Sequence, residues 1–275
     1  MFRKCIFFLF VIKLSLGFGQ KKICSKTDTS NCLVNEKFIS TKFEIEKKFE
    51  STDTVFTRQT PLLADMDGDC VPEFIVQEGN NQGILIVDTK TGLTKWRITT
   101  PYIDPKLTGM AIADVDEDGS PEIFIEAFSS FPNPGNIHGK LFSYHADGRL
   151  YWISDSRVDR YTHSRDEMGG TPALADFNQD GVPEIYVNNK IFNARTGIKL
   201  ADGGANGIGT EIAIISGGEA LTIAGHLDND STDLELAAGY TIYKVKITNL
   251  NGITGNIMTP NNIQIDNRYR DGYTT

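Results

Sequence analysis

Short apolar runs separated by glycine- and aspartate-rich turns cover most of the chain. Gly83–Val87 is mainly aliphatic, Lys95–Ile98 alternates basic with apolar residues, and the polar segment Asp88–Gly92 lies between them. Runs of this length bounded by turn residues are typical of strands joined as hairpins. The same pattern recurs around turns at Asp147-Gly148 and Thr196-Gly197. The pattern therefore predicts an all-β fold of many short strands.

An acidic loop between two apolar runs returns at regular spacing. The three clearest copies are residues 63–76, 112–125 and 174–187, and each contains Pro-Glu followed by an apolar run. A weaker fourth copy, 224–236, has His226 in place of the first aspartate and one extra residue before its glutamate. Self-similarity at a period of about 50 to 60 residues indicates a repeat architecture.

Each repeat contains the acidic hairpin and then a second hairpin, which makes four strands. Four strands in about 50 residues are the unit of a β-propeller blade, and blades must stack to bury both of their faces. A β-sandwich gives no reason to repeat one loop at this period. The sequence predicts a β-propeller over residues 58–275, with blades at about 58–105, 106–160, 168–205 and 210–258.

Residues 265–275 look like the approach to a further acidic loop, and so to the start of another blade. We therefore expect the chain to be an N-terminal fragment of a larger propeller. A closed ring of four blades is the alternative.

The acidic loops carry oxygen ligands in an order that suits calcium. Calcium binds six to eight oxygens at about 2.3–2.6 Å, and aspartates at alternate positions of a loop point toward one centre. Glycine at the sixth position permits the sharp turn, the seventh carbonyl faces inward, and a glutamate at the ninth closes the site. The expected ligands are Asp65, Asp67, Asp69, Val71 and Glu73 in the first loop, Asp114, Asp116, Asp118, Ser120 and Glu122 in the second, and Asp176, Asn178, Asp180, Val182 and Glu184 in the third.

The twelfth position separates these loops from an EF-hand, which places a bidentate glutamate there between two helices. The corresponding residues are Val76, Ile125 and Val187, all inside apolar runs. The loops are thus predicted to connect two strands. Magnesium fits less well, because it keeps its waters and seldom uses all-protein cages.

Two copies depart from the pattern. Cys70 stands where the first loop needs glycine, so we expect this site to be weakened or rearranged. In the fourth copy, Asp228, Asp230 and Glu235 are the remaining acidic residues. The sequence leaves open whether they bind metal.

The N-terminus has the pattern of a secretory signal peptide. Basic residues precede the apolar run Cys5–Ile12, and cleavage is expected before Gln20. Lys13 keeps this run far below the ~20 residues that span a bilayer. We expect a signal peptide at 1–19, no transmembrane segment in the mature chain, and a secreted or cell-surface location.

Residues 20–57 form a polar, charge-rich leader. Cys24 and Cys32 flank a polar stretch, and an export route permits a disulfide between them. Two unpaired thiols are the alternative. This pairing leaves Cys70 without an assigned partner.

Charge and residue distribution narrow the function classes. The formal net charge is −9, and removal of the signal peptide makes it about −12, which argues against a nucleic-acid partner. The four histidines, His138, His145, His163 and His226, are scattered, so no catalytic residue is assigned. Trp96 and Trp152 stand at matched positions in two repeats, which is typical of packing rather than of sugar stacking.

The repeats resemble the FG-GAP or VCBS repeats of integrin-α-like β-propellers. The resemblance covers about residues 58–258 and rests on the three acidic loops with Pro-Glu and on the hairpins leading to Trp96 and Trp152. It implies a propeller with calcium at one rim, of a secreted bacterial type, acting as a surface binding or adhesion module for a protein or a glycan. Some relatives are polysaccharide lyases or accompany carbohydrate-active modules, so a calcium-dependent lyase or related enzyme is the alternative.

Overall fold

The computed structural model divides the chain into two compact units, Met1–Ile39 and Ser40–Thr275. The residues that the structure describes all lie in the second unit; they are 47, 50, 53–55, 60–79, 83–99, 109–126, 139–158, 171–204, 222–228, 230, 232–238 and 241–261. The expected signal peptide, the Cys24–Cys32 pair and the tail at 265–275 lie outside the described residues. Within the described residues, no helix is long and apolar enough to cross a bilayer.

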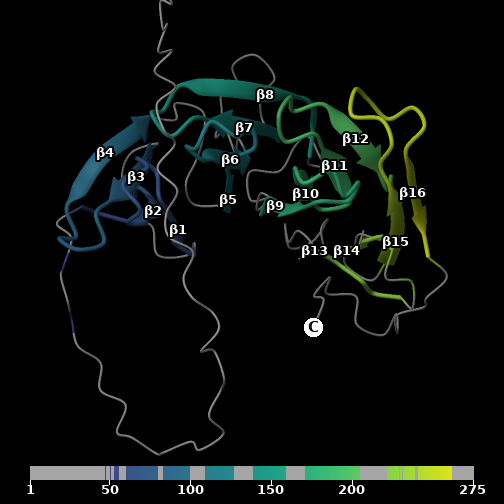
Figure 1. Cartoon of the computed structure of the whole chain (residues 1–275), viewed down its shortest axis with the longest axis horizontal. Coiled ribbons are helices and arrows are strands. Elements are labelled where there is room, and N and C mark those ends of the chain that lie inside the picture. Colours follow the sequence, from purple (N-terminus) through teal and green to yellow (C-terminus); the bar gives the residue numbers. More distant parts are fainter. Residues whose placement is uncertain are drawn as a thin grey trace, which may run out of the picture. The chain divides into compact units, whose positions relative to one another are not determined.

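The described residues form an all-β fold of four antiparallel sheets, each of four strands in sequence order (Figure 1). The four-stranded unit expected from the repeat is therefore confirmed. The first sheet is β1 (Leu62–Ala64), β2 (Glu73–Gln77), β3 (Gly83–Val87) and β4 (Thr94–Thr99); the second is β5 (Met110–Ala113), β6 (Glu122–Glu126), β7 (Lys140–Tyr144) and β8 (Leu150–Arg157). The third is β9 (Ala173–Ala175), β10 (Glu184–Val187), β11 (Lys190–Phe192) and β12 (Lys199–Asp202); the fourth is β13 (Thr222–Gly225), β14 (Glu235–Ala238), β15 (Thr241–Lys246) and β16 (Ile257–Pro260).

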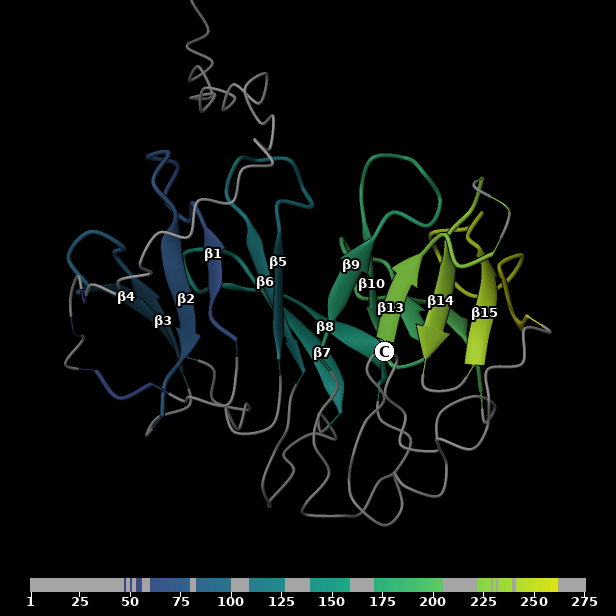
Figure 2. The same ribbon diagram turned by 90° about the horizontal axis from the view of Figure 1, so that it is seen from below.

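Each sheet is a simple meander, as Figure 2 shows for β13, β14 and β15, which lie side by side. In the first sheet, the fourth strand runs along one edge and is half exposed, whereas the second and third strands are mostly buried. The last residues before the first sheet also contact it. Val55 and Glu78 form an isolated antiparallel β-bridge, and the Gly79 N–H donates to the Thr54 carbonyl at 2.8 Å.

The inner strands are buried on both faces, which explains their continuous rather than alternating apolar sequences. In β6, Ile123 and Ile125 belong to an apolar cluster shared with the first sheet. Phe124, which points the other way, belongs to a cluster shared with the third sheet. A further apolar cluster, which includes Tyr186 and Ile191, joins the third and fourth sheets. Successive sheets therefore pack face against face.

The two tryptophans of the edge strands fix these contacts between sheets. The Trp96 indole N–H donates to the Ala146 carbonyl in the β7–β8 turn at 2.9 Å. In the next pair of sheets, the Trp152 N–H donates to the Ala194 carbonyl in the β11–β12 turn, also at 2.9 Å. The expectation that both residues serve packing agrees with this repeated contact.

The turn beneath Trp152 requires glycine. Gly197 has a φ of +70°, and a Cβ at this position would lie 2.5 Å from the indole ring. A larger residue would displace the ring and with it the bond to Ala194. The Thr-Gly signal in the sequence thus marks both a hairpin and a close approach between sheets.

Candidate metal centres

The three acidic loops share one conformation, and they connect the first two strands of the first, second and third sheets. The first aspartate accepts the backbone N–H of the sixth residue: Asp65 from Cys70 at 2.8 Å, Asp114 from Gly119 at 3.0 Å, and Asp176 from Gly181 at 2.9 Å. These sixth residues all have a left-handed φ, between +70° and +99°. The aspartate at the fifth position of each loop accepts the N–H of the seventh residue, which is Val71, Ser120 or Val182, at 2.7 to 2.8 Å.

Cys70 corrects the expected rearrangement of the first loop and its own expected lack of a partner, whereas the expected weakening of the site stays a prediction. It adopts a φ of +70° and makes the same hydrogen bond as glycine does in the other loops, so the first loop is not rearranged. The cost of a side chain in this conformation is about 1–2 kcal/mol. Cys70 is also disulfide-bonded, and it is therefore not the unassigned thiol that the Cys24–Cys32 pairing left.

The glutamate at the ninth position is a buried clamp as well as a candidate ligand. One oxygen of Glu73, Glu122 and Glu184 accepts the backbone N–H of the second loop residue at 2.9, 3.1 and 2.9 Å. Those second residues are Met66, Val115 and Phe177, which belong to the three clusters between sheets. Each loop is therefore linked through its glutamate to the packing of one sheet on the next. The second glutamate oxygen is the one not held by this backbone N–H, and it is the candidate metal ligand.

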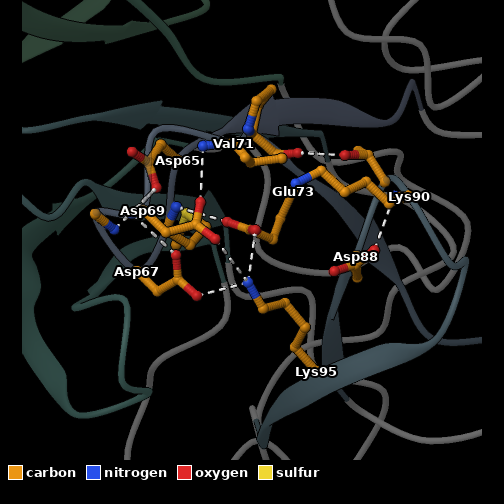
Figure 3. A network of polar contacts seen from close by, with 12 residues as sticks. Asp65, Asp67, Asp69, Val71, Glu73, Asp88, Lys90 and Lys95 are labelled. Carbon is orange, nitrogen blue, oxygen red and sulfur yellow. Dashed lines mark hydrogen bonds and ion pairs between the residues drawn. The ribbon is translucent and has the colours of Figure 1, made fainter. Parts of the chain in front are cut away.

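In the first loop a lysine already lies among the carboxylates (Figure 3). Lys95 Nζ, from β4, is 2.6 Å from Asp67 and 2.9 Å from Glu73, and Asp69 is 3.9 Å away. Asp67 and then Glu73 raise the pKa of Lys95 further above its usual value, so the ammonium stays charged. Oxygens of Asp65, Asp67 and Glu73 also lie within 4.8 Å of one another, close enough to share a cation. A metal here must displace Lys95.

In the second loop the acidic groups converge and face a histidine. Oxygens of Asp114, Asp116 and Asp118 lie within 4.8 Å of one another, and so do ligand atoms of Asp116, Glu122 and His145. Burial raises the pKa of Glu122, and Asp116 adds to this effect, while the Val115 N–H and His145 oppose it. The second loop thus concentrates negative charge and suits an oxygen-seeking cation.

The third loop has the same backbone but Asn178 in place of the central aspartate. Burial raises the pKa of Glu184 to about 7; the Phe177 N–H opposes this, and Asp180 and Asp176 reinforce it. Within the described residues, no basic side chain forms an ion pair with this loop, unlike the first and fourth loops. No described basic side chain compensates its charge, and the donor set fits Ca²⁺.

The fourth loop is engaged by protein groups instead. Lys244 Nζ lies 3.4 Å from Asp233 and 3.8 Å from Asp230, and the Asn261 side chain donates to Asp228 at 3.3 Å. Glu235 is fully buried and keeps the clamp to the Leu227 N–H at 2.9 Å. The glutamate clamp is therefore present even where the ligand pattern is incomplete.

A recess lies between the first and second loops. Its volume is about 520 Å³. The recess combines an indole, two guanidinium groups and carboxylates of both loops. Its lining includes Asp67, Trp96, Arg97, Asp118, His145 and Arg149. We call this the inter-loop recess.

Sequence reasoning missed Lys95 and His145 as members of these sites. Both approach the loop from the second hairpin of the sheet, more than twenty residues away in the chain. The only signal was their repeat position: Lys95 directly precedes Trp96, and His145 begins the turn before Trp152.

No protein-family model matches the chain. In sequence, the chain is 29% identical to human integrin alpha-6 over an alignment of 128 residues, which covers 44% of this chain and 11% of that protein. Among solved structures, the V. cholerae biofilm matrix protein Bap1 is similar at a TM-score of 0.44 and 20% identity, over 70% of this chain and 25% of that chain. The Bacillus licheniformis rhamnogalacturonan lyase PL11 is similar at a TM-score of 0.35 and 15% identity, over 72% and 50%. The chain therefore spans half or less of each of these proteins, and TM-scores below 0.5 assign no activity to it.

Proposed function

We propose that the chain is part of a secreted or cell-surface, integrin-α-like β-propeller that binds calcium in its acidic loops and a protein or glycan at its surface. The observation that carries the proposal is the coupling of each loop to the packing between sheets. The aspartates form one side of the loop, and the glutamate ties the loop to a residue of the shared apolar cluster. A cation that closes the loop would therefore stiffen the contact between two blades.

The propeller arrangement is supported by the repetition of one interface. Blades of a propeller meet through the same contacts at each step. Here Trp96 and Trp152 make equivalent bonds to the following turns, and an Asn256 side-chain N–H donates to the Leu200 carbonyl between the third and fourth sheets at 3.0 Å. We propose that the four sheets are consecutive blades of a larger propeller of the FG-GAP or VCBS type.

The second and third loops are the proposed calcium sites of higher affinity. Their ligands would be Asp114, Asp116, Asp118 and Glu122, with the Ser120 carbonyl, and Asp176, Asn178, Asp180 and Glu184, with the Val182 carbonyl. The first loop would bind calcium more weakly, because Lys95 supplies a positive charge that the ion has to displace.

The partner is proposed to bind at the inter-loop recess. Guanidinium groups form bidentate bonds to carboxylates. Arg97 is held by Glu78 at 2.7 Å, and Arg149 by Asp147 at 2.7 Å, so both are oriented but remain partly exposed. Calcium in the neighbouring loops would neutralise Asp67 and Asp118, which makes the recess more favourable for an acidic partner.

A calcium-dependent polysaccharide lyase is the second candidate. The inter-loop recess favours it, because it places guanidinium groups and His145 beside the proposed metal loops. Both candidates are tested together by incubating the chain with acidic and neutral polysaccharides, with calcium or with a chelator. Retention that requires calcium supports a binding module, and the appearance of unsaturated sugar products identifies a lyase. A chain that takes up no calcium contradicts both.

A further inference from the structure

The group that faces the second oxygen of the buried glutamate differs from loop to loop. It is an ammonium in the first loop, where Lys95 reaches Glu73. In the second loop it is an imidazole: His145 Nδ1 lies 3.1 Å from Glu122 Oε1. An ammonium excludes a metal, but a neutral imidazole nitrogen is itself a metal ligand. The second loop is therefore chemically distinct from the first.

His145 is held in place from two directions. Its backbone belongs to the β7–β8 turn, where its N–H donates to the Arg149 carbonyl and its carbonyl accepts from Gly148, both at 2.9 Å. Its ring packs on Tyr151, with the ring centroids 4.5 Å apart. The side chain is only 21% exposed. The imidazole therefore faces Glu122 with little rotational freedom left to lose on binding a metal.

Three candidate ligand side chains lie close enough together to share one ion. Ligand atoms of Asp116, Glu122 and His145 all lie within 4.8 Å of one another. Two donors at about 2.0–2.1 Å from a tetrahedral ion stand about 3.3 Å apart, close to the 3.1 Å between His145 and Glu122. Glu122 is fully buried and its Oε2 is fixed by the Val115 N–H, so the Oε1 that faces His145 is already directed.

We propose that Asp116, Glu122 and His145 form a mixed nitrogen–oxygen site for a borderline transition-metal dication such as Zn²⁺. Imidazole suits zinc and cobalt, whereas calcium takes oxygen ligands. The site extends the proposed function, because it shares Asp116 and Glu122 with the proposed calcium site of the same loop. The two ions therefore exclude each other in the second loop.

The third loop provides an internal comparison. Asn193 stands in the same place as His145, directly after the third strand, and its backbone N–H donates to the Ile198 carbonyl at 2.8 Å. An amide is a poor ligand for zinc but is compatible with calcium. The third loop is therefore expected to discriminate for calcium where the second accepts either ion.

The test uses the metal-stripped full chain, with Co²⁺ as a spectroscopic substitute for Zn²⁺ and calorimetry for Zn²⁺ and Ca²⁺. We expect visible cobalt bands of a nitrogen-containing site, one zinc equivalent, and one fewer calcium equivalent when zinc is present. His145→Asn, which copies the third loop, should weaken zinc binding on the order of 10- to 100-fold or more while calcium binding persists. His226→Asn is the control for adventitious histidine binding and should change neither.

Zinc affinity unchanged by His145→Asn, or a calcium count unaffected by zinc, overturns the proposal. If His145→Asn fails to fold by circular dichroism, Asp116→Asn replaces it, and zinc binding equal to wild type then overturns the proposal equally. The proposed function fails separately: a chain that binds zinc through His145 but takes no calcium in the third loop would retain this site and lose the calcium account.

Discussion

Lys95 Nζ lies 2.9 Å from Glu73 Oε1, so the first acidic loop contains a cation of its own. The lysine comes from the edge strand β4 and reaches Asp67 as well, at 2.6 Å. The three loops look alike in sequence, yet their charge is balanced differently. Protein charge compensates the first loop, a histidine faces the second, and the third has no basic partner within the described residues.

Replacing Lys95 should convert the first loop from a weak into a high-affinity calcium site. In Lys95→Met the aliphatic stem is kept and the ammonium is lost, so the carboxylates repel one another in the absence of metal. We expect a lower melting temperature in chelator and one additional calcium equivalent by calorimetry. Lys90→Met, on the same hairpin, is the matched control. An unchanged calcium count in Lys95→Met would show that Lys95 does not occupy the metal position.

The ninth-position glutamate can be tested for its two roles separately. Glu184→Gln keeps an oxygen for the Phe177 N–H but removes the charge, so the fold should persist while calcium affinity at the third loop falls tenfold or more. Glu184→Ala should also lose the buried clamp and cost about 1–3 kcal/mol, measured by denaturant unfolding. Equal calcium binding in Glu184→Gln and wild type would remove this residue from the ligand set.

Without metal, the third loop should make the folded chain more stable as the pH falls. The pKa of Glu184 is about 7 in the folded chain, above its ordinary value of 4.5, so the charged form is disfavoured by folding. Metal-free stability should therefore rise as the pH falls through 7, and calcium affinity should fall over the same range because protons compete. Melting temperatures at pH 8 and pH 6, with Glu184→Gln as the pH-insensitive comparison, measure this. A metal-free melting temperature of wild type that falls between pH 8 and 6 contradicts the assignment.

The tryptophan contact tests whether successive sheets are coupled. Trp152→Phe keeps an aromatic ring but removes the donor to the Ala194 carbonyl, which should cost about 1–3 kcal/mol in unfolding free energy. Leu150→Ala, on the same strand and 49% exposed, should change stability by less than about 0.5 kcal/mol. Equal effects of the two substitutions in denaturant unfolding would argue against a structural role for the bond.

The loops and the four-stranded units could be predicted because their determinants are local. Alternate aspartates, a left-handed sixth residue and a following apolar run lie within a dozen residues, and the hairpins carry their own turn residues. The roles of Met66, Val115 and Phe177 were not predicted, because their burial depends on the neighbouring sheet. Burial on both faces likewise explains why β6 carries no alternating pattern.

Lys95 and His145 could not be predicted because they meet their loops through the register of two strand pairs. Glu73 begins β2 and Lys95 lies near the start of β4, so β3 separates them in the sheet. The register irregularity between Ile86 and Val87 helps to set which β4 residue lies at this edge. A shift of one residue would turn the ammonium to the other face.

The most direct test of the central claim is the thermal unfolding of the metal-stripped chain with calcium and with chelator. The account predicts calcium uptake at the second and third loops and a higher melting temperature with calcium. At free calcium about a hundred times the dissociation constant, each site adds about 2.7 kcal/mol. Asp114→Asn and Asp176→Asn should each remove part of the gain. The same melting temperature with and without calcium, together with no calcium uptake, would contradict the account.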